Sequence, residues 1–246
     1  LCMGRSEGRE FSEDERLQAR QLADQVAVAL SNSKLIDELK ALTWGTLEAF
    51  ARAIDAKSPW TAGHSERVTT MSLRIAAKMG RSESELEVLH RGALLHDIGK
   101  LGISVKLLDK PGRLDDDEIR QVMNHPSIGG RILQPISAFS DILPIVEQHH
   151  EKFDGTGYPK KLAGEEIDIN ARILAVADTY DAMTSDRPYR KGFDHEKAVE
   201  LILEESGLQF DPRVLQAFMV AIGENPTRVP KWVGEDTLPD VAGGQG

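Results

Sequence analysis

The sequence predicts an all-α protein. Apolar residues recur at steps of three and four along most of the chain, and no two segments alternate in the way that paired strands would. Helix N-caps or acidic residues stand before several of these stretches, and Gly or Pro follows them. A chain of 246 residues can bury one large core, so we expect one main domain.

The first predicted helix begins after Ser12, an N-cap that three acidic residues follow. Its middle carries a seam of heptad spacing: Val28, Asn32, Leu35, Leu39, Leu42, Thr46 and Ala49. The polar Asn32 could set the register between two paired helices. The seam predicts either a parallel dimer through this N-terminal helix or a helix that packs on its own domain.

Further helices are predicted from apolar stripes and breakers along the rest of the chain. The stripes lie at 47–54, at 68–79 before Gly80, and at 86–94 before His96. Four acidic residues open a helix at 115 that runs to about His125, where Pro126 is expected to stop it. A turn-rich loop follows at 154–159, then helices at about 170–185, 195–205 and 212–222. Residues 223–246 are expected to form a flexible tail.

Composition excludes several classes of function. The net charge of −10 opposes binding to nucleic acid or to an anionic membrane. No apolar run approaches the ~18 residues of a membrane helix, and the charged first stretch is unlike a signal peptide. With Cys2 as its one cysteine, the chain can form no internal disulfide, which fits a reducing, cytoplasmic location.

Histidines and aspartates in the predicted helices indicate a metal centre. They are His64, His96, His125, His149 and His150, with Asp97 and Asp178. Burying such groups is costly unless a cation pairs with them. His96 and Asp97 are neighbours at the end of a helix that Gly99 can terminate. Neighbouring side chains on a helix diverge, so His96 and Asp97 can hold one ion while the second carboxylate oxygen of Asp97 reaches another. Seven N and O donors without thiolate suit two octahedral ions, iron or manganese before zinc. The alternative is a set of unrelated histidines.

A longer set of motifs resembles one family. The motifs are HDIGK at 96–100, HP at 125–126, HHE at 149–151, DG and GYP at 154–159, ARILAVAD at 171–178 and RPYR at 187–190. In this order and spacing they resemble the HD-GYP family of HD-domain phosphohydrolases, over roughly residues 47–222. The resemblance implies an HD-domain helical bundle and metal-dependent hydrolysis of cyclic di-GMP to linear pGpG or GMP.

The resemblance also implies roles for single residues. His64, His96, Asp97 and Asp178 would hold one ion, and Asp97, His125, His149 and His150 the other. A hydroxide held between the ions would attack phosphorus, with Asp97 and Lys100 at the catalytic centre. Lys100, Tyr158, Arg187 and Arg190 would contact the substrate. Where some relatives carry a glutamate that helps to bind a third ion, this chain has Trp60, so we expect two ions.

Several of these assignments have alternatives. Arg187 and Arg190 could be ordinary surface cations, and Tyr158 could simply cover its loop. Asp181 is expected to support a ligand or to cap its helix rather than to bind metal, and the same holds for Glu151, which could orient a neighbouring imidazole. The substrate could instead be another cyclic dinucleotide, such as cyclic GMP-AMP, or a nucleotide monoester. A weakly active module that binds the dinucleotide or docks a diguanylate cyclase is the alternative outside enzymes.

The N-terminal part is similar to a different family. Residues 11–39 resemble the last helix of a GAF sensory domain that runs into an output domain. This similarity predicts the end of a GAF-like domain and a signalling helix at 1–43, followed by an HD-GYP catalytic domain at 44–222. The helix would then transmit the state of an upstream sensor.

Overall fold

The computed structural model describes residues 11–186 and 191–230 of the chain. Within them it contains α-helices and short 3₁₀ helices but no strand, apart from an isolated bridge between Ser206 and Phe210. The all-α prediction is therefore confirmed. The α-helices are α1 (Glu13–Asp55), α2 (His64–Lys78), α3 (Glu83–Leu95), α4 (Val105–Leu108), α5 (Asp116–Met123), α6 (His125–Leu133), α7 (Leu143–Gln148), α8 (Ile169–Thr184), α9 (His195–Glu204) and α10 (Pro212–Ile222). The 3₁₀ helices are η1 (Pro59–Thr61), η2 (Ile98–Gly102), η3 (Ser137–Phe139), η4 (Gly164–Glu166) and η5 (Pro226–Arg228).

The chain divides into two compact units, residues 1–46 and 47–246. The first contains most of α1. A capping box starts that helix, because Ser12 and Glu15 each accept a hydrogen bond from the other's backbone N–H, at 3.2 and 2.8 Å. The side chains of Val28, Leu35 and Leu39 on the predicted seam are exposed.

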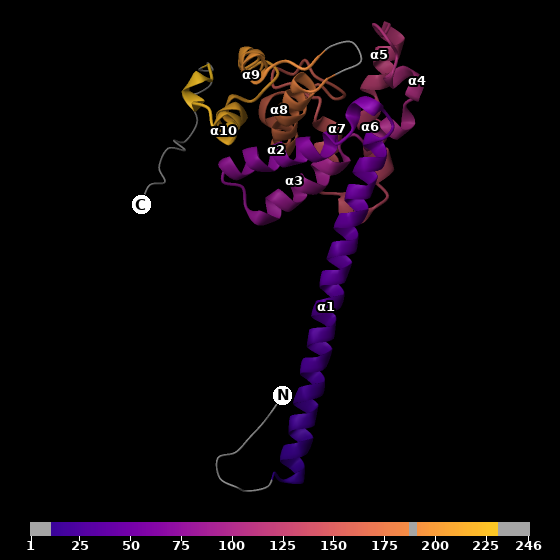
Figure 1. Ribbon diagram of the computed structural model, residues 1–246, viewed down its shortest axis with the longest axis vertical. Coiled ribbons are helices and arrows are strands. Elements are labelled where there is room, and N and C mark those ends of the chain that lie inside the picture. The colour runs from indigo at the N-terminus through magenta and orange to yellow at the C-terminus, as the bar shows by residue number, and fades with distance from the viewer. Residues whose placement is uncertain (1–10, 187–190, 231–246) are drawn as a thin grey trace. The chain divides into compact units, whose positions relative to one another are not determined.

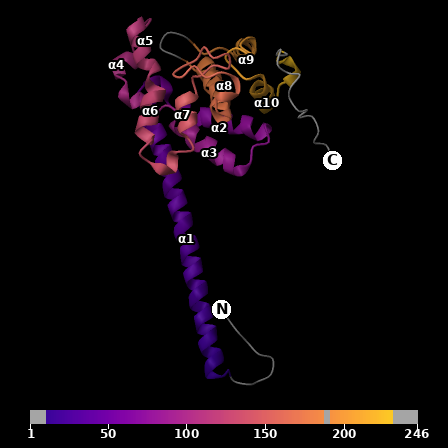
Figure 2. The same cartoon turned by 180° about the vertical axis from the view of Figure 1, so that it is seen from behind.

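The second unit is built around α2 and α8 (Figures 1 and 2). Helix α2 packs against α3, α8 and α10, while α8 also packs against α7 and α9. Helix α8 is apolar on all sides between Ile173 and Ala177, as a helix surrounded by others must be, and Ile173, Leu174 and Val176 are fully buried. This arrangement brings one face of α8 next to the first turn of α2.

Local signals in the sequence start these helices. Ser82 and Asp115 each form a capping box with the glutamate three residues on, at the starts of α3 and α5. Helix α10 ends at Gly223, whose φ of 84° lies in the left-handed region that a C-terminal glycine adopts readily. The expected helices at 170–185, 195–205 and 212–222 match α8, α9 and α10 within about two residues.

Two expectations differ in detail from the structure. Pro126 marks a break, since α5 ends at Met123, but it does not itself stop a helix: it occupies the first turn of a new helix, α6, where a missing N–H costs no hydrogen bond. The segment from residue 223 also begins with structure, since η5 follows α10 and Val229 is buried. Residues 231–246 of the expected tail lie outside the described residues.

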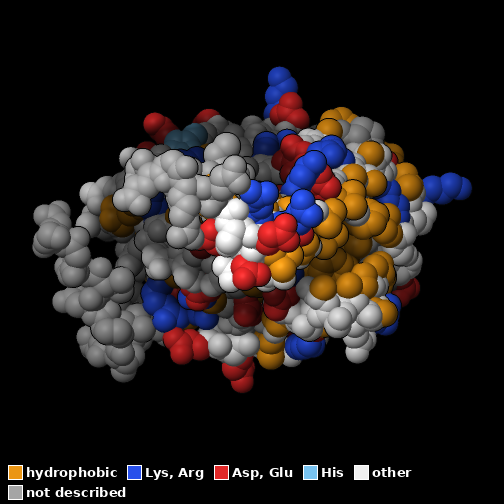
Figure 3. Space-filling view, turned by 90° about the horizontal axis from the view of Figure 1, so that it is seen from below, with side chains coloured by type: hydrophobic (Ala, Val, Ile, Leu, Met, Phe, Trp, Pro, Cys, Tyr) orange, Lys and Arg blue, Asp and Glu red, His pale blue; other side chains and the backbone are white. Residues whose placement is uncertain are grey.

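The surface gives a first view of possible contacts. In the face shown in Figure 3, hydrophobic side chains gather on one side, and acidic and basic side chains are mixed near the centre. Among the described residues, none of the helices is both long enough and apolar enough to cross a membrane.

Candidate metal centre

Six of the seven side chains predicted as ligands lie at or next to the ends of helices, and the seventh lies within α8. They are His64 (first in α2), His96 (following α3), Asp97 (preceding η2), His125 (first in α6), His149 and His150 (following α7) and Asp178 (in α8). His96 and Asp97 were expected at the end of a helix and His149 and His150 on another helix, and both pairs lie just past a helix end. Chain direction changes there, so the side chains of a pair can point to different neighbours.

The structure brings these side chains into two groups. His64, His96 and Asp178 form the first group, and His125, His149 and His150 form the second; within each, ligand atoms lie within 4.8 Å of one another. Both are groups that could hold a metal ion. Only Asp178 and His150 are partly exposed.

Asp97 lies between the two groups and faces both. Its Oδ1 is 3.3 Å from Nε2 of His125 in the second group. Its Oδ2 is 3.4 Å from Nε2 of His96 and 3.8 Å from Nε2 of His64 in the first group. The two carboxylate oxygens therefore address different groups, as the oxygens of a bridging ligand would.

Backbone carbonyls determine which nitrogen of three rings carries hydrogen. In His96, His125 and His149, Nδ1 lies 2.7, 2.8 and 2.9 Å from the carbonyl oxygen of the residue three positions earlier. A carbonyl can only accept, so each Nδ1 must donate. In the neutral ring Nε2 then has a free lone pair, which is the form that a metal ion requires.

These lone pairs have poor partners within the protein. Among the described residues, the buried Nε2 of His96 has no hydrogen-bond partner. Nε2 of His125 lies 3.2 Å from Nε2 of His149, so two acceptors face each other. A buried polar atom without a partner is costly, and a cation between these nitrogens would satisfy them. The residues therefore fit the metal ions that the resemblance implies.

The charge states in the second group also suit a metal ligand. Burial and the neighbouring imidazoles lower the pKa of His149 well below its usual value. Burial, followed by the charge of His125, lowers the pKa of His150 to about 3. Both rings are therefore neutral at physiological pH.

Acidic groups determine the charge in the first group. Burial would raise the pKa of Asp97, but Lys100 and His96 outweigh burial and hold it well below its usual value. The pKa of Asp178 is also lowered, since its hydrogen bond to His64 and the charge of that ring outweigh burial. Burial of His64 opposes protonation, but hydrogen bonds to Asp178 and Asp181 prevail and raise its pKa to about 10. The first group thus attracts positive charge strongly.

Asp181 supports His64, as expected from the sequence. Its Oδ2 lies 2.7 Å from Nδ1 of His64, on the opposite side of the ring from Asp178. Arg67 holds Asp181 in turn, with Nε 2.6 Å from Oδ1 and Nη2 3.0 Å from Oδ2. Sequence analysis missed Arg67, although it follows His64 by three residues just as Asp181 follows Asp178.

Two lysines form hydrogen bonds at Asp97 and the segment that follows it. The Lys100 ammonium donates to Oδ2 of Asp97 and remains partly exposed beside the centre. The Lys57 ammonium donates to the carbonyl oxygens of Lys100, Leu101 and Ile103, at 2.5, 3.0 and 2.5 Å. Lys57 thereby fixes the carbonyl end of η2. No motif or spacing in the sequence indicates this role.

The loop after His150 forms a wall of the site. Tyr158 stacks on the His150 ring, with 4.9 Å between centroids and 28° between planes. Burial, with the charges of Asp178 and Asp97, raises the pKa of Tyr158, so its hydroxyl remains able to donate. A Cβ on Gly157 would lie 2.2 Å from the backbone nitrogen of Lys152, so only glycine permits this close approach.

Glu151 has a different role from the one expected. It does not orient an imidazole: its buried carboxylate accepts the backbone N–H groups of Lys160 and Leu162, at 2.7 and 3.2 Å. It therefore holds the loop that carries Tyr158. A sequence cannot reveal which backbone groups a buried carboxylate will meet.

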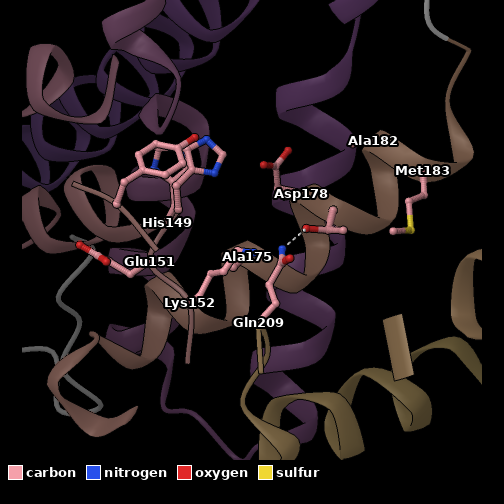
Figure 4. A pocket seen from close by; sticks show the side chains of 11 residues that line it. His149, Glu151, Lys152, Ala175, Asp178, Ala182, Met183 and Gln209 are labelled. Carbon is pink, nitrogen blue, oxygen red and sulfur yellow. Dashed lines mark hydrogen bonds between the residues drawn. The ribbon is translucent and has the colours of Figure 1, made fainter. Parts of the chain in front are cut away.

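A pocket of about 470 Å³ opens next to the centre (Figure 4). Its lining includes His149, His150, Glu151, Lys152, Tyr158, Ala175, Asp178, Thr179, Ala182, Met183 and Gln209. The Gln209 amide donates to the Thr179 hydroxyl at 3.4 Å, and both residues line the pocket together with Asp178. Tyr158 was expected at this place, whereas Thr179 and Gln209 were not, because neither belongs to a motif with recognisable chemistry.

Three remaining predictions concern residues elsewhere. Arg187 and Arg190 lie outside the described residues. Gly99 was expected to end a helix, but it lies inside η2, where a Cβ would be 1.8 Å from the His125 carbonyl oxygen. Trp60, at the position expected for a third-ion ligand, is exposed.

Comparisons with known proteins agree with this picture. The HD domain family model matches residues 48–214. The chain is 43% identical over 178 residues to 3'3'-cGAMP-specific phosphodiesterase 3 of Vibrio cholerae, covering 72% of this chain and 39% of that protein. It is 36% identical over 210 residues to the cyclic di-GMP phosphodiesterase response regulator RpfG of Xanthomonas campestris, covering 82% and 56%. A cyclic di-GMP phosphodiesterase of Thermotoga maritima is 43% identical over 160 residues, covering 63% and 43%.

The chain thus spans about half the length of these curated relatives. Solved structures show the same fold. One is the cyclic GMP-AMP phosphodiesterase V-cGAP3 of V. cholerae, with a TM-score of 0.57, 20% identity and coverage of 74% of this chain and 49% of that one. Another is Bd1817, an HD-GYP-type protein of Bdellovibrio bacteriovorus, with a TM-score of 0.55, 24% identity and coverage of 68% and 53%.

Proposed function

The chain belongs to the HD domain family, and from this premise we propose that it is a metal-dependent phosphodiesterase that hydrolyses cyclic di-GMP. The product is linear pGpG, and GMP if the second bond is also cleaved. One observation carries the proposal: two groups of side chains that could hold metal ions meet at Asp97, beside a pocket.

We assign two divalent ions to the centre. His64, His96 and Asp178 would hold one ion, His125, His149 and His150 would hold the other, and Asp97, which faces both groups, would serve both ions. The donors are imidazole nitrogens and carboxylate oxygens without thiolate, which favours iron or manganese. When bound, these ions supply the positive charge that activates water and offsets charge on the phosphate oxygens.

The protein's own groups position the phosphodiester. Lys100 is partly exposed beside Asp97, so its ammonium can contact a phosphate oxygen from the pocket side. Tyr158 provides a flat wall and a hydroxyl that can donate. We keep Arg187 and Arg190 as proposed substrate contacts. In the reaction a water oxygen forms the new bond to phosphorus, the bond to the 3′ oxygen breaks, and that oxygen takes up a proton.

The names of relatives support the substrate class. RpfG and the T. maritima protein are named cyclic di-GMP phosphodiesterases. The 43% identical V. cholerae protein is named for 3'3'-cGAMP, which favours cyclic GMP-AMP as a second candidate. The two dinucleotides differ in one base, so the pocket must distinguish guanine from adenine. The Gln209 amide and Thr179 hydroxyl offer hydrogen bonds that could read a base edge.

Turnover of both dinucleotides tests the proposal. The chain would be purified without oxygen, loaded with Fe²⁺ or Mn²⁺ and incubated with cyclic di-GMP or 3'3'-cGAMP, with products separated by chromatography. We expect pGpG from cyclic di-GMP and a loss of at least about 100-fold in Asp97→Asn. Asp141→Asn, which alters an exposed ion pair with Arg91, is the matched control and should retain full activity.

Other results would change the conclusion. Faster hydrolysis of 3'3'-cGAMP would support the second candidate. Binding of either dinucleotide without hydrolysis in any metal, unaffected by Asp97→Asn, would contradict an enzyme. It would instead support a binding module, for example one that docks a diguanylate cyclase.

We further propose that residues 1–43 end a GAF-like sensory domain and that α1 joins two chains in a parallel dimer. The exposed Val28, Leu35 and Leu39 repeat at heptad steps, and pairing would remove them from water. Light scattering after gel filtration should show a dimer, which Leu35→Lys should dissociate. Ser33→Lys lies off the seam and should leave the dimer intact. A monomeric native chain at micromolar concentration would contradict this proposal.

We place this activity in the cytoplasm. A reducing compartment suits a chain whose one cysteine is Cys2, and it would keep bound iron reduced. Fractionation of cells that express the native gene, with the protein detected by antibody, tests this placement; recovery outside the cytoplasmic fraction would contradict it.

A further inference from the structure

The four buried histidines that face Asp97 or its neighbours are not oriented in the same way. His96, His125 and His149 each direct Nδ1 to a neutral backbone carbonyl. His64 instead has Nδ1 2.7 Å from a carboxylate oxygen of Asp181. A carboxylate that accepts the ring N–H makes the opposite nitrogen a stronger donor to metal and also fixes the ring orientation.

Asp181 is itself held rigidly. Arg67 binds both of its oxygens, at 2.6 and 3.0 Å, and also donates to the Ala62 carbonyl at 2.9 Å. The side chain of Asp181 is only 9% exposed. The planar fork of arginine suits this bidentate pairing, so Asp181 is kept ionised and aimed at His64.

The arrangement follows from two helices with the same spacing. His64 and Arg67 are three residues apart on α2, and Asp178 and Asp181 are three residues apart on α8. Residues three apart lie on one helix face. Helix α2 packs against α8, so the four side chains contact one another in the order Asp178, His64, Asp181 and Arg67. Along this order acidic and basic side chains alternate. His64 is therefore held between Asp178 at Nε2, 3.2 Å away, and Asp181 at Nδ1.

The second group has no equivalent support. Its ligand atoms come from His125, His149 and His150, and Asp97 is shared with the first group. Among the described residues, no carboxylate accepts Nδ1 of His125 or His149, since backbone carbonyls do. The first group thus combines Asp178 as a ligand with Asp181 behind another ligand, while the second has only imidazole ligands of its own.

We propose that Asp181, held by Arg67, is a positioning residue that makes the His64, His96 and Asp178 group the tighter of two unequal ion sites. The second group would then hold the ion that exchanges and is lost first. This inference rests on the proposed function for its two ions, but it concerns their order of binding rather than the reaction. Asp181 acts through His64 and touches neither ion.

Metal titration tests the inference without measuring hydrolysis. The full chain, stripped of metal, would be titrated with Mn²⁺ and followed by electron paramagnetic resonance, with bound metal measured by mass spectrometry. We expect two steps. Asp181→Asn keeps an acceptor but loses the charge, and should weaken the tighter step about 10-fold; Asp181→Ala should weaken it up to about 100-fold. The weaker step should stay within about twofold of the native value.

Controls separate positioning from general damage. Asp211→Asn is matched, because Asp211 is a buried aspartate held by Arg172 and Arg213 outside the centre. It should lower the free energy of unfolding but leave both metal steps unchanged. If Asp181→Asn does not fold, Arg67→Lys decides the question, because it keeps the charge but loses the fork and should still weaken the tighter step.

Each outcome has a clear meaning. The inference would be overturned if the native chain binds Mn²⁺ in two steps of equal affinity. It would also be overturned if Asp181→Asn has no effect, weakens both steps equally or weakens only the weaker step. Neither result would contradict the proposed function. In the arm with Arg67→Lys, an unchanged tighter step would likewise overturn the inference. A native chain that binds no Mn²⁺ and no Fe²⁺ would overturn the proposed function as well.

Discussion

Replacing Gly99 by alanine should separate the two halves of the metal centre. A Cβ at this position would lie 1.8 Å from the His125 carbonyl oxygen and 2.6 Å from the Gly129 nitrogen, where ordinary contact begins at 3.4 Å. Both atoms belong to the backbone of α6, so no side-chain rotation relieves the clash. Either η2 or α6 must move by roughly 1.5 Å.

The cost of this movement can be estimated. Overpacking usually costs about 1–3 kcal/mol, and a backbone clash belongs at the upper end, so we expect a loss of about 3 kcal/mol in the free energy of unfolding. Asp97 lies two residues before Gly99, and its Oδ1 is 3.3 Å from Nε2 of His125. A displacement of this size between catalytic groups can cost about 100-fold in rate, and we expect at least that for phosphodiester hydrolysis.

Three measurements on Gly99→Ala test the prediction: urea unfolding without metal, Mn²⁺ titration and initial rates of cyclic di-GMP hydrolysis. Gly102→Ala is the matched control in the same 3₁₀ helix. Its Cβ would meet only the Ile128 side chain, at 3.0 Å, which can adjust. Ion affinities within about twofold of native and rates within about threefold for Gly99→Ala would refute the requirement for close contact between η2 and α6.

The remaining predictions concern the supports of the centre. Lys57→Met loses three hydrogen bonds to carbonyl oxygens from a partly exposed ammonium, and should lower the free energy of unfolding by about 2 kcal/mol in urea. Glu151→Gln replaces one of the two acceptor oxygens by an NH2 group, so one backbone N–H of the Tyr158 loop loses its hydrogen-bond acceptor. This change should raise KM several-fold in steady-state kinetics while ion affinity stays unchanged. Mn²⁺ added at about 100 times its Kd should stabilise the metal-free chain by about 2.7 kcal/mol per site in urea unfolding, reversibly with chelator.

Each of these has a control or a contradicting result. Lys197→Met removes a surface lysine paired with Glu200 and should change stability by less than about 0.5 kcal/mol. If Lys57→Met lowers the free energy of unfolding no more than Lys197→Met does, Lys57 does not hold η2. A change in metal affinity in Glu151→Gln would indicate that Glu151 orients an imidazole ligand, as the sequence predicts. No stabilisation by any divalent ion would contradict binding to the folded centre.

The residues that gather at the centre could be identified from sequence because their chemistry is unusual. Imidazole and carboxylate groups in apolar helices, such as His96 and Asp178, are costly without a partner, so their presence is informative. The seven side chains do lie together, in two groups around Asp97. Their roles as ligands remain predictions. The helical fold could also be predicted, since caps and periodic stripes depend on neighbours in sequence.

The supports could not be predicted because they depend on contacts between distant segments. Gly99 looked like a helix terminator until the backbone of α6 was seen against it. Glu151 binds N–H groups of a loop, and Lys57 binds carbonyls that only the folded chain brings within reach. Pro126 marked a boundary correctly, but the sequence signal for a break is the same as the signal for a first turn.

The placement of six of the seven candidate ligands at or next to helix ends has a mechanical consequence. Ions bound there would link the ends of α2, α3, α6 and α7 to the interior of α8, so that fraying of any of these four ends would release a ligand. Slow amide hydrogen exchange should then extend through all five helices together once the ions are bound. Loss of metal would soften this part of the protein as a whole, and its activity and its rigidity would disappear together.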